Sequence, residues 1–470
     1  MGKILGAYLV PHPPIVVKEI GKGEEKAAQK TIDGMQEVAK DIRQKAPGVI
    51  LFITPHGPIF QDAIAILARK ELKGDFSDFR AREVRFAKRN HLELAERIRK
   101  YANEEGIWCA LVDPDLEREY HISGDLDHGV MVPMYFIDQE YTDYQIVHIT
   151  YGLLPGEELY RFGMCVQKGI QDMQEDAVVI ASGDLSHRLT KDAPAGYHPK
   201  GKEFDETLIN SLAEWKIETL FSLPPELCRD AGECGLRSVQ VMLGACDGYE
   251  VQPEVLSYEG PFGVGYGVAK MEIGEFHESR KMFSRIKQAR MEQMKAIRNA
   301  EDEYVRLARE ALETYVKYGK TIEVPKTASE EMLRNRAGVF VSLKKAGELR
   351  GCIGTIHPTT ENVAAEIIRN AIHAGTKDPR FYPVEENELD QLVYSVDVLK
   401  EPEPINGLEE LDVKRYGVIV QSKGKTGLLL PNLDNVNTVE EQVSIALQKA
   451  GIRPGESYRL QRFEVVRHGE

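Results

Sequence analysis

The chain has 470 residues, so two or more domains are expected, since single hydrophobic cores rarely grow beyond about 250–300 residues. Hydrophobic residues make up 42% and charged residues 29%, which is typical of a soluble globular protein. The 60 basic and 75 acidic side chains give a net charge of −15, which argues against a nucleic-acid partner.

Membrane and disulfide features are not expected either. No apolar run approaches the ~20 residues needed to cross a bilayer, and the first residues, MGKILGAYLVPHPP, lack a signal-peptide cleavage site. The six cysteines are scattered without a C-x-x-C pair. This usage suits a reducing compartment, so we predict a cytoplasmic protein with no membrane partner.

Residues 1–275 alternate strand-like and helix-like segments. Strands are predicted at 4–10, 49–54, 145–150, 177–181, 250–257 and 263–273. Such alternation predicts an α/β domain with a mixed sheet flanked by helices.

Residues 276–318 change character, because apolar residues recur at three- and four-residue steps among many charges, without Gly or Pro up to residue 318. This pattern predicts one or two long amphipathic helices, and we assign 276–299 as a helical linker. Residues 300–470 then show strand patterns around a helical segment, ENVAAEIIRNAIHAGT, which predicts a smaller α+β domain.

Four histidines of the first domain stand at strand ends or in neighbouring turns. His12 lies in VPHPP, His56 in TPHGP, His128 in LDHG and His187 in GDLSH. Ligands of α/β sheets bind where the carboxyl ends of strands gather, so the imidazoles are expected to converge there. Neutral imidazole suits Fe, Zn or Cu.

A carboxylate would complete a 2-His-1-carboxylate face that leaves positions open on Fe(II). Glu233, in AGECG, is the candidate, because it precedes a helix-like run and would point into the cleft. The structural alternative is an acidic residue that only stabilises a helix N-terminus.

In this order, the motifs VPHPP, TPHGP, LDHGVMVP, SGDLSH and AGECG resemble the class III extradiol ring-cleaving dioxygenases, the LigB-like family that includes the Memo proteins. The resemblance implies that His12, His56 and Glu233 bind iron. It also implies that His187 is the catalytic acid/base and that His128 is a second catalytic histidine in the pocket.

The resemblance further implies the chemistry of the site. An aromatic diol of the catechol type and O2 would react at Fe2+, with His187 accepting and returning a phenolic proton. Asp127 and Asp184 are candidates for fixing histidine tautomers, and both also suit turns. Tyr120, His121 and Tyr197 are weaker candidates for the pocket wall.

Cys234 directly follows Glu233, and in Memo-type relatives a cysteine occupies the third metal position. A thiolate would shift the preference toward Cu or Zn. Two alternatives therefore stay open: a Memo-like metal-binding redox or scaffolding protein without ring cleavage, and a Zn-dependent hydrolase.

The second domain carries ELRGCIGTI (348–356), with KDPRF (377–381) and YSVDVL (394–399), and resembles the AMME syndrome candidate gene protein family. Cys352 beside Arg350 suggests an activated thiol, against the alternative of a small buried residue. His357 and Asp378 are candidates to share its site. The fusion resembles the AmmeMemoRadiSam system, which implies a radical-SAM enzyme as partner, and extradiol relatives suggest a homo-oligomer.

Overall fold

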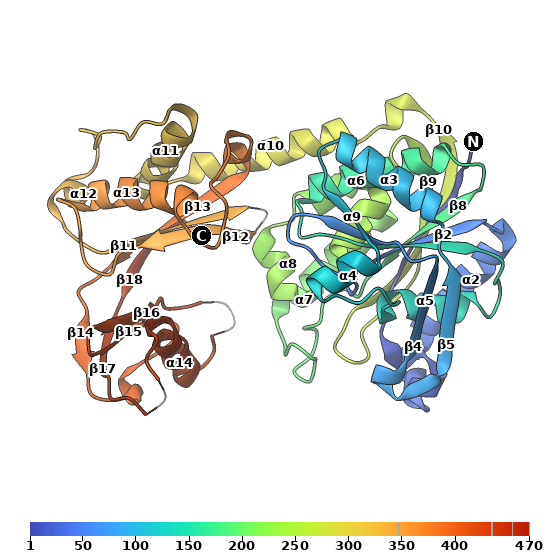
Figure 1. Ribbon diagram of the computed structural model, residues 1–470, viewed down its shortest axis with the longest axis horizontal. Coiled ribbons are helices and arrows are strands. Elements are labelled where there is room, and N and C mark those ends of the chain that lie inside the picture. Colours follow the sequence, from blue (N-terminus) through green and yellow to red (C-terminus); the bar gives the residue numbers. More distant parts are fainter. Residues whose placement is uncertain (346, 434–435, 454, 470) are drawn as a thin grey trace. The chain divides into compact units, whose positions relative to one another are not determined.

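The computed structural model describes residues 1–345, 347–433, 436–453 and 455–469 (Figure 1). The chain divides into two compact units, Met1–Gln293 and Met294–Glu470. Each unit is described by itself below.

The N-terminal unit is built on a mixed eight-stranded sheet with the order β6-β3-β7-β2-β8-β1-β10-β9. Its strands are β1 (Ile4–Val10), β2 (Val49–Thr54), β3 (Ile64–Leu67), β6 (Cys109–Val112), β7 (Gln145–Thr150), β8 (Ala177–Ser182), β9 (Tyr249–Glu259) and β10 (Tyr266–Phe276). The four central strands β7, β2, β8 and β1 run parallel, whereas β10 is antiparallel to β1. The predicted α/β class with a mixed sheet is confirmed.

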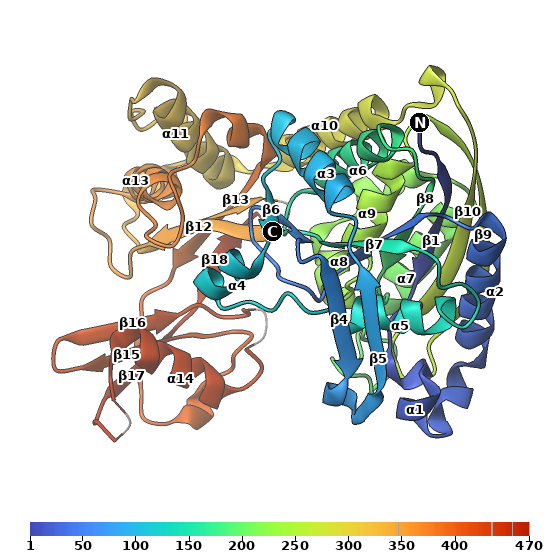
Figure 2. The ribbon, with the colours of Figure 1, turned by 45° about the vertical axis from the view of Figure 1, so that its right-hand side comes forward.

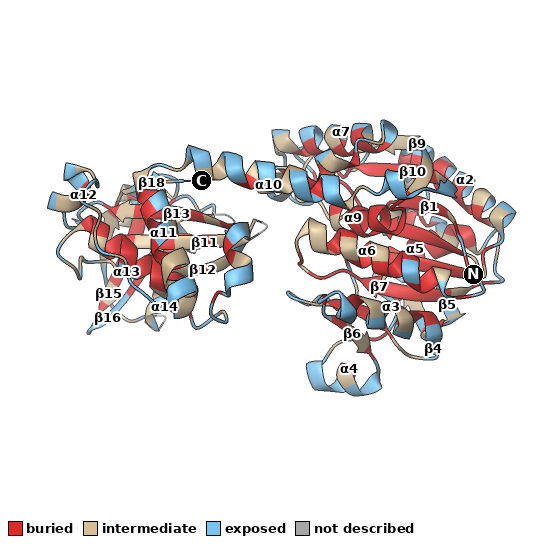
Figure 3. Ribbon diagram, turned by 90° about the horizontal axis from the view of Figure 1, so that it is seen from above, coloured by how far each residue is buried: buried red, intermediate tan, exposed pale blue. Residues whose placement is uncertain are grey.

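The central strands are buried on both faces, which is why they are nearly continuous runs of Val, Ile, Leu, Phe and Ala. Helices cover both faces, and Figure 3 shows the buried sheet between them. The helices are α1 (Lys18–Gly21), α2 (Gln29–Lys45), α3 (Leu92–Glu104), α4 (Pro114–Tyr120), α5 (His128–Ile137), α6 (Gly156–Gln171), α7 (Pro199–Ala213), α8 (Pro225–Ala231) and α9 (Leu236–Ala245). One core contains side chains of α3, α6, α7 and α9, and the other contains side chains of α2 and α5.

Sequence analysis missed two short strands and a hairpin. β3 and β6 have only four residues each, too few for a clear alternation. The hairpin of β4 (Glu71–Phe76) and β5 (Ala81–Arg89) forms a separate two-stranded sheet beside α5 (Figure 2). Its tip is a short 3₁₀ turn, Ser77–Phe79.

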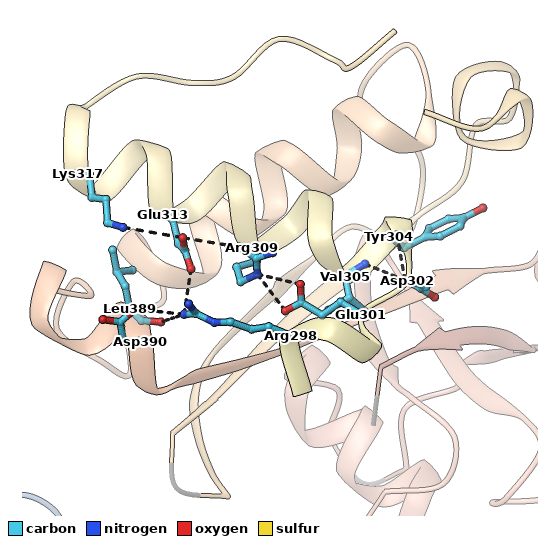
Figure 4. Close-up of polar contacts among 10 residues, drawn as sticks. All are labelled: Arg298, Glu301, Asp302, Tyr304, Val305, Arg309, Glu313, Lys317, Leu389 and Asp390. Atoms are coloured by element: carbon cyan, nitrogen blue, oxygen red, sulfur yellow. Dashed lines mark hydrogen bonds and ion pairs between the residues drawn. The ribbon is translucent and has the colours of Figure 1, made fainter. Parts of the chain in front are cut away.

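The amphipathic segment after the sheet forms two helices, α10 (Phe283–Ala300) and α11 (Glu303–Tyr318). They separate at Asp302, whose carboxylate caps α11 by accepting hydrogen bonds from the backbone N–H groups of Tyr304 and Val305. Arg309 pairs with Glu301 at 2.8 Å and Arg298 pairs with Glu313 at 3.3 Å (Figure 4). These pairs hold the end of α10 against α11.

The C-terminal unit contains two antiparallel four-stranded sheets, with the orders β12-β11-β13-β18 and β14-β17-β15-β16. The strands are β11 (Val339–Lys345), β12 (Glu348–Gly354), β13 (Leu392–Leu399), β14 (Glu403–Ile405), β15 (Gly417–Ser422), β16 (Lys425–Leu429), β17 (Arg459–Phe463) and β18 (Val465–His468), and the further helices are α12 (Glu330–Arg334), α13 (Val363–Thr376) and α14 (Val439–Ala450). α11 and α13 pack on the first sheet, and α14 packs on the second. In the described part of the chain, no helix combines the length and the apolar character needed to cross a bilayer.

Candidate metal centre

Two of the predicted histidines follow nearby parallel strands at the same edge of the sheet. His12 comes two residues after β1, and His56 comes two residues after β2. A proline between each strand and its histidine lacks the N–H that would continue the ladder, so the chain turns there. Because β8 alone separates β1 from β2, the two turns bring their imidazoles to one place.

The imidazoles of His12, His56 and His128 meet at this edge. Nε2 of His12 lies 2.9 Å from Nε2 of His56. His128 is the first residue of α5, and its ring stacks on that of His56 with 4.0 Å between centroids. One nitrogen from each ring lies within 4.8 Å of the others, so these three histidines form a group able to hold a metal ion.

The tautomer of His12 follows from its neighbours. The Ser182 hydroxyl, at the end of β8, donates to the carbonyl of Gly129 and lies 2.9 Å from Nδ1 of His12. Since a hydroxyl has one proton, Ser182 accepts from His12, and the ring proton of His12 sits on Nδ1. The lone pair of His12 Nε2 therefore points at His56, which is the orientation that a metal ligand needs.

The environment keeps these rings neutral. Burial, followed by repulsion from His56 and His128, lowers the pKa of His12 well below its usual value. Burial and the neighbouring His128 lower the pKa of His56 to about 4. Burial also lowers the pKa of His128. Neutral imidazole is the form that binds metal ions, so the cluster is prepared for a cation at neutral pH.

His187 stands in the loop after β8. Its Nδ1 lies 2.6 Å from the carbonyl oxygen of Gly232, which places the ring proton on Nδ1 and leaves Nε2 as an acceptor. Burial lowers the pKa of His187, so the ring is uncharged near pH 7. A protonated His187 would disfavour protonation of His12 and His56, and so contributes to their lowered pKa values.

The structure separates the two candidates for a third ligand. The carboxylate of Glu233 accepts a 2.7 Å hydrogen bond from the backbone N–H of Leu236, in the first turn of α9. This contact is the one expected if Glu233 only stabilises the N-terminus of the helix. Neither Glu233 nor Cys234 belongs to the described group of converging ligand atoms. Sγ of Cys234 lies 3.6 Å from Nε2 of His12. Cys234 is thus the candidate with a contact to His12, and the choice of Glu233 as third ligand stays a prediction.

Two glycines bring the Cys234 loop to the histidines. A side-chain carbon on Gly183 would overlap with Cα of Gly235, so only glycine permits this approach of the β8 loop to the start of α9. The backbone N–H of Cys234 then donates to the carbonyl of Asp184 over 3.3 Å. The position of the thiol is thus set by backbone packing between segments about 50 residues apart.

Asp127 and Asp184 were the candidates for fixing histidine tautomers, and the structure shows which groups they contact. Asp184 accepts from the backbone N–H of His12 at 2.8 Å, and burial raises its pKa to about 7. Asp127 accepts from the hydroxyl of Thr54 and lies 3.0 Å from Nε2 of His148. Neither carboxylate has a recorded hydrogen bond to the rings of His128 or His187, so their influence on the cluster is positional and electrostatic.

Sequence analysis missed His148 and Phe79. His148 is fully buried in β7, two residues before the strand ends. Its position near the end of a predicted strand could have identified it from the sequence. Phe79, at the hairpin tip, meets the ring of His128 edge to face with 5.4 Å between centroids. Among the weaker candidates for the pocket wall, Tyr120, His121 and Tyr197 are exposed.

The C-terminal motif is stabilised by paired charges. Arg350 binds Glu388 through two hydrogen bonds of 3.0 and 2.8 Å and is therefore committed to a carboxylate, not to the thiol. Asp378 accepts from the backbone N–H of Cys352 and pairs with Arg380 at 2.7 Å. Cys352 is partly buried and burial raises its pKa, which argues against an activated thiol.

Profiles of two families match the chain. The profile described as the catalytic LigB subunit of aromatic ring-opening dioxygenase matches residues 6–269. The profile described as AMMECR1 matches residues 305–468. The predicted resemblance to both families is confirmed.

Relatives match either nearly the whole chain or about a third of it. A protein of Clostridium acetobutylicum is 50% identical over 466 residues, which is 99% of each chain. A protein of Thermotoga maritima is 51% identical over 170 residues, which is 36% of this chain and 98% of the relative. The crystal structure of PH0010 from Pyrococcus horikoshii is 37% identical, covers 35% of this chain and 88% of that one, and gives a TM-score of 0.33.

Proposed function

Because the chain belongs to the family of the catalytic LigB subunit of aromatic ring-opening dioxygenases, we propose that its N-terminal unit is a metal-dependent oxidoreductase. The substrate class is a catechol-like aromatic diol, with O2 as co-substrate and Fe2+ as the metal. One observation supports the proposal above all: the Nε2 atoms of His12 and His56 face each other at 2.9 Å.

The donor set fits a transition metal. His12 and His56 present two ring nitrogens 2.9 Å apart, and neutral imidazoles would bind Fe, Zn or Cu. Ser182 orients the His12 lone pair, and the lowered pKa values keep both rings unprotonated. When bound, iron would supply electron transfer and Lewis acidity at this point.

The remaining chemistry belongs to residues of the chain. His187, with its Nδ1 proton held by Gly232, offers a free Nε2 to take the proton of a phenolic hydroxyl and to return it later. His128, whose ring meets Phe79 edge to face, would donate or accept a further hydrogen bond to the substrate. The aromatic face of Phe79 and the stacked His56 would favour a flat ring as substrate.

The test combines metal loading with substituted proteins. Iron loaded without oxygen and then exposed to air should consume O2 with at least one member of a catechol panel. His187→Ala should retain the metal and lose turnover, while exposed His277→Ala should match the parent in both. Full turnover by His187→Ala would refute the acid/base role.

The position of Cys234 favours a second candidate. With a thiolate beside His12, the unit would be a Memo-like redox metalloprotein that works with a radical-SAM enzyme and does not cleave rings. Cobalt-loaded protein would then show a thiolate-to-metal absorption band that Cys234→Ser removes. If that band is absent and the protein takes up O2 with a catechol, the ring-cleaving oxidoreductase is favoured.

A further inference from the structure

The C-terminal unit has a groove that the proposed metal chemistry does not use. It lies between α13, the end of α11 and the segment 321–324, and its volume is 360 Å³. This volume is at the lower end of the range for small-molecule sites, about 300–1,000 Å³. The lining residues are Tyr315, Thr321, Ile322, Val324, Ala365, Ile368, Arg369, Ile372, His373 and Lys377.

One part of the lining is apolar. Ile368 and Ile372 stand four residues apart on one face of α13 and are buried. Ile322 and Val324 approach from the neighbouring segment and are partly buried against the same core. Ile322 and Val324 thus keep some hydrocarbon surface open to a ligand, above a floor formed by the buried Ile368 and Ile372.

The other part is basic. Arg369, His373 and Lys377 follow each other at four-residue steps, so they form one stripe along α13. No Asp or Glu occurs among the lining residues, although the protein has a net charge of −15. Nζ of Lys377 lies 3.3 Å from Nε2 of His373, so the lysine donates to a neutral imidazole.

Helix stability alone does not explain this stripe. Cations are favoured in the last turn of a helix, but Arg369 stands seven residues before the end of α13, at Thr376. Burial and then the neighbouring cations of Lys377 and Arg369 lower the pKa of His373.

We propose that this groove binds a small organic acid. The carboxylate would lie on Arg369, His373 and Lys377, and the apolar body of the acid would cover Ile322, Ile368 and Ile372. Arg369 gives one N–H to the hydroxyl of Thr359 and has further donors for a carboxylate. The site is separate from the histidine cluster and does not depend on the metal.

The test uses the full-length protein and three eight-carbon probes: octanoate, octanol and octylammonium. Calorimetry should show saturable binding of octanoate, weaker binding of octanol and none of octylammonium. In nuclear magnetic resonance spectra, octanoate should shift the ring signals of His373 and raise its titration midpoint, because the carboxylate offsets the two cations.

Substitutions locate the site. Lys377→Gln should weaken octanoate binding up to about fivefold, and Arg369→Gln with Lys377→Gln should weaken it further. Lys449→Gln, in the last turn of α14, makes the same charge change outside the groove and should leave binding unchanged. Equal binding of octanol and octanoate, unmoved His373 signals, or full affinity in the double variant would each overturn the proposal.

Discussion

The histidine cluster of the N-terminal unit and the L-R-G-C-I-G strand of the C-terminal unit both concentrate polar side chains, but their charges are arranged in opposite ways. Around Cys352, Arg350 has Glu388 and Arg380 has Asp378. Around His12, three imidazoles turn their nitrogens toward one another. A site that has its own counter-charges is stable without a ligand, whereas the neutral rings of His12 and His56, 2.9 Å apart, have no counter-charge to lose and can turn their nitrogens to a cation.

This contrast explains why the histidine cluster suggests a reactive site, whereas the L-R-G-C-I-G strand suggests a structural role. β12 is the edge strand of its sheet, and Asp378 satisfies the N–H group of Cys352 that no neighbouring strand reaches. Arg380 in turn neutralises Asp378 and holds its pKa at about 2. The KDPRF segment thus secures an edge strand, while the histidines lack such an internal function.

The largest expected effect is loss of the metal when a histidine is removed. His12→Ala and His56→Ala should each lower affinity for Fe2+ or Zn2+ by more than about 100-fold, because each removes a ligand that no neighbour replaces. Metal analysis after dialysis measures this, with His277→Ala as the matched control. Stoichiometric metal in both variants would contradict the centre.

The third ligand gives the sharpest contrast between adjacent residues. Cys234→Ser should lower metal affinity by more than about tenfold, because a hydroxyl is a poor substitute for a thiolate. Glu233→Gln should stay within a few-fold of the parent, since the amide oxygen still accepts from Leu236. Competition with a chelator measures both, and the reverse order would restore Glu233 as the ligand.

Substitution of Ser182 tests whether its hydroxyl sets the tautomer of His12. Ser182→Ala removes the acceptor for the Nδ1 proton of His12, so the ring is free to rotate or to place its proton on Nε2. We expect a decrease of about 10- to 100-fold in metal affinity, typical of lost supporting hydrogen bonds. An unchanged affinity at constant fold would mean that packing alone orients His12.

Asp378→Ala tests whether the polar residues around Cys352 have a structural role. It leaves the Cys352 N–H without its acceptor and Arg380 without its counter-charge, so we expect local destabilisation of about 1–3 kcal/mol. Hydrogen exchange at the Cys352 amide should accelerate accordingly. Exposed Asp390→Ala is the control, and metal content should not change in either variant.

The smallest expected effect is a difference in pH dependence. An unfolded histidine has a pKa near 6.5, whereas His56 has about 4, so the metal-free N-terminal unit should lose stability as pH falls from about 6.5 to 4. Asp378, with a pKa of about 2, loses its contribution only as pH falls from about 3.9 toward 2. Both tryptophans, Trp108 and Trp215, lie in the first unit, so their fluorescence follows that unit, and exchange at Cys352 follows the second. Coincident pH windows would contradict this difference.

Much of the fold followed from sequence patterns. Buried parallel strands require continuous apolar runs, and the runs before His12 and His56 are long enough to be recognised. The hairpin that carries Phe79 was missed, because its strands are partly exposed and β4 contains Gly74. The break between α10 and α11 was left open, since Glu301 and Asp302 suit either a continuous helix or a cap.

By itself, the sequence determined that His12 and His56 end two buried strands, because proline stops the ladder just before each of them. Only the tertiary structure shows which side chain contacts His12 from the loop before α9. Glu233 and Cys234 are adjacent and point apart, and the contact of Gly183 with Gly235 turns the thiol toward His12. Likewise, Arg350 pairs with Glu388, which is 38 residues away in the sequence. A local sequence pattern cannot predict this contact, because folding alone brings the two residues together.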